Sequence, residues 1–385
     1  MDFQLTPEQR DLQQLVRDIA HRELAPLASR WDRTHEFPWD SIRALGRAGV
    51  LGLTIPERYG GVGGSWFEAV LAIEEVARVC YQTAMAVLGE LGVQTQTIVH
   101  YGTDAHKARY LPAVGRGELI CAICMTEPDA GSDAGAILTQ ATAAKDGYTI
   151  NGSKVLISRA DVAGVFLTFV RFGDTPGSRG VGAVLIDRGT PGLEIGPGEE
   201  TLGGELLFPV YFHDVHLSPE AVLVKEHGFR KLMAAFNGQR CLNAAISLGQ
   251  AQGAFDAAVT YVQTRRQFGQ RLADFQGVQW MLADMAIDLD AARLLIYRAA
   301  CNAGAGLPDQ VEAAKAKAFA NETAIHVSNQ AMQLFGGHGY LKSMQVERFL
   351  RGARFGALAG GTPQIQRNII ADSLVGRRAT GRARD

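Results

Sequence analysis

Apolar residues recur at intervals of three and four along the first third of the chain, which is the pattern of helices with one buried face. Thr6 is a candidate N-cap, Pro7 suits the first helical position, and Gln9 can complete a capping box. Three more helices are expected, at 41–50, 66–80 and 83–101. The glycine-rich segment 59–64 lies between the helices expected at 41–50 and 66–80. We interpret it as a tight turn, since no phosphate-loop lysine follows it.

From about residue 119 to residue 224 the pattern changes to short β-branched and aromatic runs separated by glycine and proline. Seven strands are expected, at 120–125, 139–143, 148–150, 154–158, 165–171, 181–186 and 209–217. Asp146-Gly147 is a hairpin signal. Because these strands do not alternate with helices, a sandwich or barrel is favoured over a doubly wound parallel sheet.

After residue 228 the pattern is helical again, and the segments are long. Helices are expected at 229–266, 276–303, 310–335 and 364–374. Long antiparallel helices form bundles. The chain is therefore predicted to be α+β, mainly α, with a helical domain at 1–118, a β domain at 119–226 and a helical bundle at 227–385. The basic tail after Gly376 is expected to be poorly ordered.

Composition narrows the class of protein. With 47% hydrophobic and 20% charged residues among 385, the chain is not expected to be disordered. A net charge of −2 without a block of basic residues argues against a nucleic-acid partner. Five cysteines are too few for a disulfide framework. No run of ~18 apolar residues and no signal-peptide pattern occurs, so we expect a cytoplasmic protein with no membrane contact.

Two pairs of potential metal ligands have a spacing of three residues. They are Cys121 with Cys124, and His213 with His216, and both pairs fall on predicted strands. Residues three apart on a regular strand point to opposite faces, and no second cysteine pair exists to complete a zinc site. No metal is expected.

The most specific motif is Met-Thr-Glu-Pro-Asp-Ala-Gly-Ser-Asp, residues 125–133, at the end of a predicted strand. Hydroxyls and backbone N–H groups in a glycine-bearing turn can bind a phosphate or the polar edge of a flavin. Four more motifs follow along the chain, at 151–158, 265–269, 333–340 and 361–367.

Together these five motifs resemble the acyl-CoA dehydrogenase family of flavoproteins over almost the whole chain. The resemblance implies an N-terminal helical domain, a middle β-barrel or sandwich domain and a C-terminal four-helix bundle. It implies bound FAD and an acyl thioester substrate carried by CoA or an acyl carrier protein. It also implies a homotetramer built as a dimer of dimers, with electron-transfer flavoprotein as a candidate electron acceptor.

The resemblance assigns five FAD contacts to the β domain. Met125, Thr126 and Ser132 match the family's turn over the flavin ring and pyrophosphate. Leu156 and Ser158 match the segment behind the isoalloxazine, where the family usually has Trp and Thr. Losing the Trp removes a stacking wall from the flavin site.

The other assigned FAD contacts lie in the predicted bundle. Arg265 and Phe268 match residues that reach the ADP half of the FAD bound to a neighbouring subunit. An Arg there suits the pyrophosphate charge. The adenine-side loop and the segment after the catalytic position supply four more, Gln333, Gly337, Thr362 and Gln364.

The chain departs from the family at the catalytic base. The usual base, which removes the substrate's α-proton, is the Glu of a Glu-Gly-Thr motif, and here Gly360 occupies that position. A minority of the family places the Glu before an Arg on the first long bundle helix, and here that pair is Gln239-Arg240. An amide cannot act as a base at neutral pH. The backbone N–H of Gly360 can still donate to the thioester oxygen.

Three functions therefore stay open. A dehydrogenase could use a relocated base, for which Glu90 is the candidate, although a helix carboxylate is ordinarily a solvated charge. The enzyme could instead perform thioester chemistry without net dehydrogenation, such as desulfination, β-elimination or ring closure. The 3-sulfinopropionyl-CoA desulfinases share the Ala-Gly-Gly-Thr and Gln-Arg segments, but Met85 stands where they hold the sulfinate with an Arg. The third class is a flavin monooxygenase such as an N-hydroxylase, or a non-catalytic flavin-binding protein.

Overall fold

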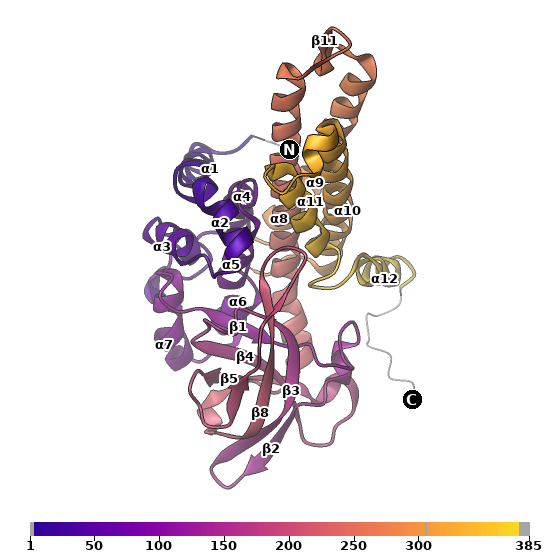
Figure 1. The fold of residues 1–385 in the computed structure, drawn as a ribbon. Coiled ribbons are helices and arrows are strands. Elements are labelled where there is room, and N and C mark those ends of the chain that lie inside the picture. Colours follow the sequence, from indigo (N-terminus) through magenta and orange to yellow (C-terminus); the bar gives the residue numbers. More distant parts are fainter. Residues whose placement is uncertain (1–3, 305, 377–385) are drawn as a thin grey trace. The chain divides into compact units, whose positions relative to one another are not determined.

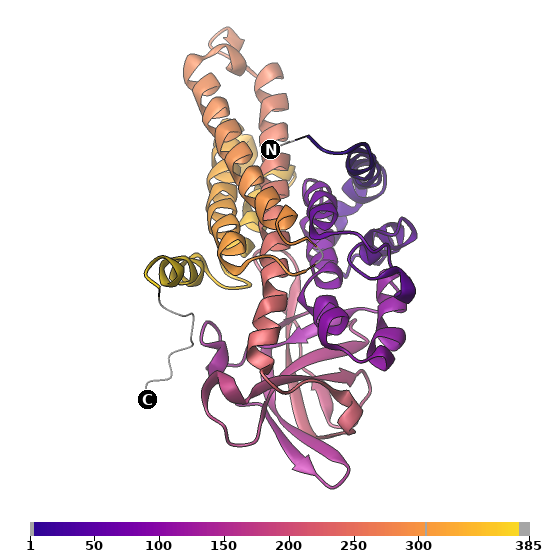
Figure 2. The ribbon, with the colours of Figure 1, turned by 180° about the vertical axis from the view of Figure 1, so that it is seen from behind.

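The computed structural model describes residues 4–304 and 306–376 (Figures 1 and 2). These residues fall into two compact units. The helical unit contains the residues up to 34, 65–85 and 240–371, and the sheet unit contains 35–64, 86–239 and the residues from 372 onward. The tail at 377–385, for which poor order was expected, lies outside the described residues.

The helical unit begins with α1 (Pro7–Ile19), which starts as the sequence predicts. The Thr6 hydroxyl accepts from the Gln9 N–H at 3.3 Å, and the Gln9 side chain accepts from the Thr6 N–H at 3.0 Å. This capping box satisfies two N–H groups that the helix itself cannot bond. A π-helical turn (Ala20–Leu24) leads into α2 (Ala25–Thr34), and α4 (Trp66–Ala77) has its own capping box between Ser65 and Glu68.

Long helices complete this unit. They are α8 (Gly228–Thr264, of which the part from 240 onward belongs here), α9 (Gln276–Cys301), α10 (Gln310–Leu334), α11 (Gln345–Gly356) and α12 (Pro363–Leu374, of which the part up to 371 belongs here). α10 packs against both α9 and α11. The short strands β10 (Arg266–Gln267) and β11 (Gln270–Arg271) form a hairpin at the end of α8 (Figure 1). The sequence did not predict α11, although Val346, Phe349 and Ala353 form a buried stripe at helical spacing.

The sheet unit is built on a mixed sheet. In the described residues its order is β6-β8-β3-β2-β4-β5-β9, with β1 paired to β4 and β7 to β8. The strands are β1 (Cys121–Cys124), β2 (Gln140–Ala144), β3 (Gly147–Ser158), β4 (Val165–Phe172), β5 (Val181–Asp187), β6 (Leu193–Ile195), β7 (Glu199–Glu200), β8 (Leu206–Leu217) and β9 (Val222–Val224). Most pairs are antiparallel, while β4 runs parallel to β1 and β2.

The two predicted strands at 148–150 and 154–158 are one strand, β3, whose register with β8 shifts twice. The intervening Asn-Gly-Ser, which indicated a turn, is accommodated as an irregularity within the strand. The strands β6, β7 and β9 were not predicted, because two or three residues are too few to show an alternation.

The cysteine pair and the histidine pair, which were considered as metal ligands, differ in whether their two side chains lie on opposite faces of the strand. Cys121 packs in one hydrophobic cluster and Cys124 in another, as expected for opposite faces of a strand. The prediction that His213 and His216 diverge is wrong, because the β8 backbone is irregular at Asp214, whose φ is 49°. Phe212 and Val215 therefore enter the same core, and both histidines are exposed. The described residues contain no group of three or more potential metal ligands.

Helices also belong to the sheet unit: α3 (Trp39–Arg47), α6 (Val93–Tyr101), α7 (Asp104–Gly115) and the end of α5 (Tyr81–Leu91). The single helix expected at 83–101 is interrupted at Gly92, where an added Cβ would lie 2.2 Å from the Leu88 carbonyl oxygen. α7, which contains Pro112, was not predicted. The glycine-rich segment at 59–64 is a turn, as expected, with positive φ at Gly60 and Gly63.

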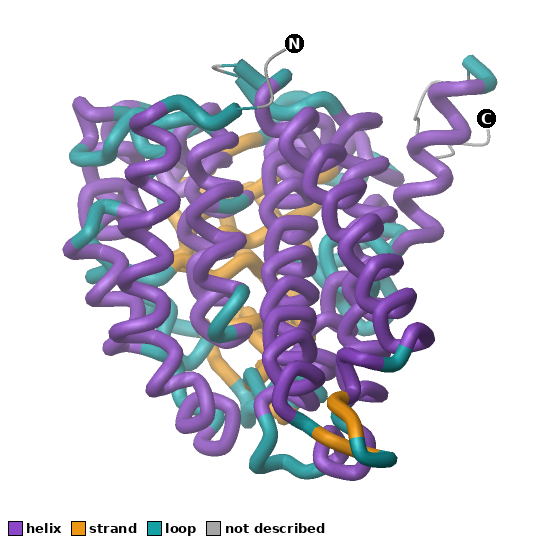
Figure 3. Tube along the Cα trace, turned by 90° about the horizontal axis from the view of Figure 1, so that it is seen from above, coloured by secondary structure: helices purple, strands orange, loops and turns teal. Residues whose placement is uncertain are grey.

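Helix is the more abundant element, as the purple and orange tubes of Figure 3 show, which confirms the predicted α+β, mainly α fold class. Among the described helices, none is long and apolar enough to span a membrane. The predicted domain boundaries after 118 and 226 stay a prediction.

Candidate active site

The segment after β1 forms a turn suited to an anionic or polar ligand. Glu127 and Ala130 bond each other's backbone at its neck. In the described part of the chain, the N–H groups of Gly131 and Ser132 have no acceptor, and a Cβ added at Gly131 would meet no atom within 4 Å. Consecutive unbonded N–H groups in an open turn favour a phosphate. These features fit the pyrophosphate side of a dinucleotide cofactor.

A buried ion pair ties this turn to β3. Lys154, with no exposed surface, donates to Glu127 Oε1 at 2.8 Å and to the Met125 carbonyl at 3.2 Å. Glu127 also accepts from the N–H groups of Leu138 and Thr139. Burial acts to raise the pKa of Glu127, but the Lys154 ammonium and these hydrogen bonds prevail and hold that pKa below its usual range.

The same contacts bring predicted flavin residues together. The Val155 N–H donates to the Thr126 carbonyl at 2.9 Å, so the Met125–Thr126 backbone lies against the segment that carries Leu156 and Ser158. Leu156 is 60% exposed and has a φ of 59°, an uncommon conformation for a residue with a Cβ. An exposed apolar side chain on a strained backbone is consistent with the ligand-facing position predicted for Leu156.

Glu90 is buried, so the expectation of a solvated helix charge is wrong. Every residue of α5 is buried, and Glu90 has no exposed surface. Its Oε1 lies 3.4 Å from Nη1 of Arg159, which follows Ser158 and also donates to the Ala86 carbonyl at 3.0 Å. This pair could not be predicted from the sequence, because its two residues are 69 positions apart.

The Glu90–Arg159 pair is only partly satisfied. Within the described residues, Oε2 of Glu90 and Nε of Arg159 have no hydrogen-bond partner. When the Gln94 amide is oriented with its oxygen toward Arg159, that oxygen accepts from Nη2 at 2.8 Å. Gly89 leaves the space that the guanidinium needs, since a Cβ there would lie 1.6 Å from Nη1.

Burial raises the pKa of Glu90 to about 7, against the opposing effect of the Arg159 guanidinium. Burial also lowers the pKa of Arg159. A carboxylate with a pKa near 7 can accept a proton from a substrate at neutral pH. The pair therefore has the electrostatics of a candidate base. Glu90 was a candidate from the sequence, but its burial and its contact with Arg159 were not predicted.

In the helical unit, Gly360, which the sequence predicts to occupy the usual base position, lies in the turn between α11 and α12. Gly360 has a φ of 67° and Gly361 a φ of 89°, so a residue with a Cβ at either position would be strained. No atom of the described residues accepts from the N–H of Gly360 or Gly361. The turn therefore offers hydrogen-bond donors and no carboxylate.

The alternative base position also lacks a carboxylate. The Gln239 side-chain oxygen accepts from the Val93 N–H at 3.1 Å, at the start of α6. Its amide is thus engaged at a helix N-terminus that has no cap of its own. Arg240 is 6% exposed, and burial lowers its pKa to about 10.

The predicted FAD contacts of the bundle lie at three places in the helical unit. Arg265 and Phe268 belong to the exposed hairpin after α8, where Phe268 is 94% exposed. Gln333 and Gly337 lie at the end of α10, and the Tyr261 and Phe335 rings stack at 4.2 Å and join these two chain segments. Thr362 and Gln364 begin α12, where the Thr362 hydroxyl accepts from the Ile365 N–H at 3.4 Å.

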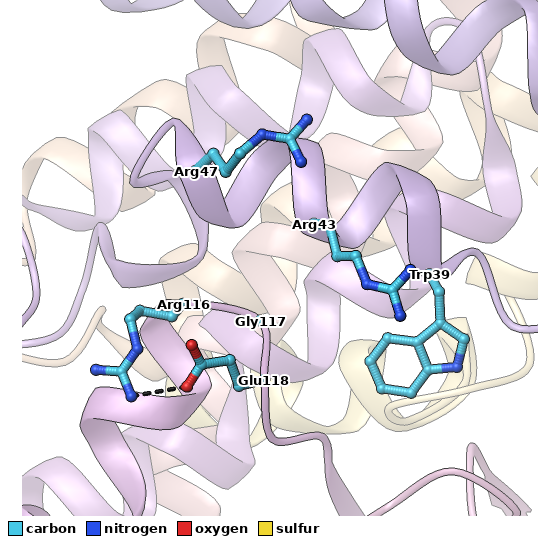
Figure 4. Close-up of a pocket in the computed structure, with 6 residues that line it drawn as sticks. All are labelled: Trp39, Arg43, Arg47, Arg116, Gly117 and Glu118. Atoms are coloured by element: carbon cyan, nitrogen blue, oxygen red, sulfur yellow. Dashed lines mark hydrogen bonds and ion pairs between the residues drawn. The ribbon is translucent and has the colours of Figure 1, made fainter.

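A separate hollow in the sheet unit has a volume of about 490 Å³ and is lined by Trp39, Arg43, Arg47, Arg116, Gly117 and Glu118 (Figure 4). Two of these residues, Arg116 and Glu118, form an ion pair at 2.7 Å (Figure 4). None of the predicted cofactor or catalytic residues lines it.

The chain is 38% identical over 377 residues to the short-chain specific acyl-CoA dehydrogenase of Clostridium acetobutylicum, covering 97% of this chain and all of that one. The protein belongs to the acyl-CoA dehydrogenase family. Models of that family's N-terminal, middle and C-terminal domains match residues 6–118, 122–215 and 226–375.

Two further family members are similar over nearly their whole length. The 3-sulfinopropanoyl-CoA desulfinase of Cupriavidus necator is 39% identical over 386 residues, covering 97% of this chain and 96% of that one. Butyryl-CoA dehydrogenase from Megasphaera elsdenii superposes with a TM-score of 0.94 at 34% identity, covering 97% of this chain and all of that one.

Membership confirms the predicted family and three-domain fold, and makes the protein an FAD-using enzyme of acyl-CoA thioesters. The turn at 125–133 fits such a cofactor, as its free N–H groups show. The assignment of individual FAD contacts stays a prediction.

Proposed function

We propose that the protein is an FAD-dependent enzyme that removes the α-proton of an acyl-CoA thioester with a displaced base, Glu90. One observation carries this proposal. Glu90 is a fully buried carboxylate with an unpartnered oxygen, and its pKa of about 7 suits proton transfer at neutral pH. FAD, when bound, would accept the hydride from the β-carbon.

Arg159 supports the proposed role in two ways. It engages only one oxygen of Glu90, which leaves Oε2 available to a proton. Its positive charge also favours the ionised carboxylate, so that burial does not carry the pKa of Glu90 far above neutrality. Arg159 and Leu156, both with positive φ, flank Ser158 at the end of β3, the segment to which the family assigns the flavin wall.

The N–H of Gly360 is proposed to bind the thioester oxygen. A donor at this oxygen makes the α-proton more acidic by stabilising the negative charge that develops on its removal. This contact needs no side chain, so the glycine at the usual base position preserves it.

Stopped-flow bleaching of the flavin tests the proposal. Butyryl-CoA should reduce the flavin of the wild type, and Glu90→Gln should lower the rate about 10²–10⁴-fold, the usual effect of losing a positioned base. Glu194→Gln, which alters an exposed carboxylate of the same unit, serves as the control and should retain the wild-type rate. Equal rates in the wild type and Glu90→Gln would refute Glu90 as the base.

Thioester chemistry without net dehydrogenation is the second candidate. It is favoured by the lack of a carboxylate at the two positions predicted for the base, Gly360 and Gln239. The desulfinases that resemble this chain point the same way, whereas a buried Met85 weighs against their sulfinate substrate. Release of a β-leaving group without flavin bleaching would favour this candidate over dehydrogenation.

We further propose that the enzyme is a homotetramer that uses electron-transfer flavoprotein as its acceptor and works in the cytoplasm. The assembly is supported by the resemblance of Arg265 and Phe268 to family residues that reach the FAD of a neighbouring subunit, and Phe268 is 94% exposed on the hairpin after α8. Light scattering and reoxidation of the reduced enzyme by electron-transfer flavoprotein test the first two points.

A further inference from the structure

Lys317, on α10, is a fully buried lysine whose ammonium group is completely hydrogen-bonded. Its Nζ donates to Asn321 Oδ1 at 3.0 Å, to the Gly356 carbonyl at 2.7 Å and to the Gly361 carbonyl at 2.9 Å. Three acceptors match the three N–H donors of an ammonium. Lys317 thereby joins α10 to the end of α11 and to the turn that holds the usual base position.

A polar network on two helices fixes Lys317 in place. Asn321 accepts from Lys317 and donates to Asn243 at 3.1 Å and to Ser247 at 2.6 Å, both on α8. The end of α11 packs directly on this network, because a Cβ at Gly356 would lie 2.3 Å from the Asn321 amide nitrogen. The ammonium therefore has a defined position relative to the turn.

The turn depends on these contacts for its conformation. Two consecutive glycines with positive φ have more conformational freedom than any other pair of residues. The Gly361 carbonyl is held by Lys317 and by the buried amide of Gln366, each at 2.9 Å. C=O and N–H point in opposite directions across a trans peptide, so the held Gly361 carbonyl fixes the direction of the Thr362 N–H. The Gly360 carbonyl lies 3.5 Å from the same Gln366 amide, and this contact directs the Gly361 N–H to the opposite side.

Lys317 also contributes charge beside the turn. Its Cε lies 3.6 Å from the position that a Cβ on Gly360 would take. Burial and the Arg240 guanidinium lower the pKa of Lys317 to about 7, whereas its three carbonyl and amide acceptors favour the protonated form. A cation held under a turn of free N–H groups favours negative charge on an oxygen bound there.

We propose that Lys317 is a positioning residue for thioester activation: it holds the Gly360–Gly361 turn so that its free N–H groups can bind and polarise the substrate's carbonyl oxygen. This inference rests on the proposed function, because it requires that an acyl thioester binds. It does not require Glu90 to be the base.

The test is infrared difference spectroscopy of bound crotonyl-CoA, with and without ¹³C at the thioester carbonyl. In the wild-type holoenzyme, binding should shift the carbonyl band to lower frequency. Lys317→Met should lose most of this shift and should lower the bleaching rate with butyryl-CoA about 10²-fold, the effect of losing one donor to a developing oxyanion. Lys315 lies on the same helix but is exposed, so Lys315→Met should keep the wild-type carbonyl shift and the wild-type bleaching rate.

Gln366→Met provides a second variant if Lys317→Met does not fold with FAD bound. Gln366 is the other donor to the Gly361 carbonyl, so its loss should reduce the carbonyl shift in the same direction but by less. A full shift in Lys317→Met would overturn the proposal. If only Gln366→Met binds FAD, a full shift in that variant would contradict the premise that the contacts to the Gly361 carbonyl set the conformation of the turn. If the wild type itself binds no acyl-CoA, the proposed function fails instead.

Discussion

Two buried carboxylate–cation pairs lie along β3 and just beyond its end, and they differ in how well each carboxylate is satisfied. Glu127 and Lys154 meet at 2.8 Å, and Glu127 accepts further bonds from two backbone N–H groups. Glu90 and Arg159 meet at 3.4 Å, and one oxygen of Glu90 has no described partner. The pKa of Glu127 is accordingly lowered, whereas that of Glu90 is raised to about 7.

The difference separates a pair that stabilises the fold from a pair that we propose to be catalytic. A carboxylate that accepts several hydrogen bonds is stabilised as an anion and cannot take up a proton near neutrality. A buried carboxylate with a single long contact gains little from its charge, and its affinity for a proton rises. Glu127 therefore anchors the turn at 125–133, and Glu90 is the group suited to chemistry.

The largest expected effect comes from breaking the structural pair. Lys154→Met leaves Glu127 buried without its cation, which should lower the free energy of unfolding by about 3–5 kcal/mol and weaken FAD retention. Urea denaturation of the holoenzyme measures the first effect, and flavin absorbance after gel filtration the second. Lys145→Met, on an exposed turn next to β3, is the control. If Lys154→Met lowers the free energy of unfolding by less than about 1 kcal/mol, the pair does not anchor the turn.

The two pairs should also respond to pH in opposite directions. Glu90 binds its proton more tightly in the folded state, so its contribution to stability is fully present below 4.5 and is lost as the pH rises through about 7. A shift from 4.5 to about 7 corresponds to about 3 kcal/mol. Glu127, with a lowered pKa, contributes stability above 4.5 that is lost as the pH falls through its folded-state value.

Unfolding free energies of the wild type, Glu90→Gln and Glu127→Gln between pH 4 and pH 8 measure these contributions. The difference between wild type and Glu90→Gln should change with pH mainly between about 4.5 and 7, and that for Glu127→Gln mainly below 4.5. Identical pH dependence in the two variants would remove the distinction between the pairs.

A smaller effect, on FAD binding, is expected from a substitution at Arg265, which belongs to neither pair. Arg265 is exposed and predicted to hold the FAD of a neighbouring subunit, so Arg265→Ala should weaken FAD binding by about 1–3 kcal/mol without changing the stability of either pair. Fluorescence titration of the apoprotein with FAD measures the binding, with Arg10→Ala as the control. A monomer that retains FAD fully would contradict the shared site.

The features that the sequence predicted are local ones. The capping box at Thr6 involves residues three apart, and the replacement of the usual base is predicted from Gly360 in its motif and from Gln239 beside Arg240. Glu90 was named as a candidate, but its burial was not foreseen, because Arg159 reaches it across 69 positions. Long-range pairing of this kind leaves no periodic signal in one sequence.

The burial of Lys317 likewise could not be predicted from the sequence. In the run Ala-Lys-Ala-Lys, Lys315 and Lys317 are alike in sequence, and both would ordinarily be assigned to solvent. Lys315 is exposed, whereas Lys317 is fully buried because α11 and the turn after it supply its acceptors. Since α11 was not predicted from its apolar stripe, those acceptors could not have been anticipated.

The pH dependence of flavin bleaching by butyryl-CoA, measured in single turnovers on the wild type and Glu90→Gln, tests the central claim most directly. The account predicts that the wild-type rate rises with pH with a midpoint near 7, because Glu90 must be ionised to accept the α-proton. Glu90→Gln should be slow at every pH and should lack that midpoint. A wild-type midpoint near 7 that persists unchanged in Glu90→Gln would contradict the account and assign the base to another residue.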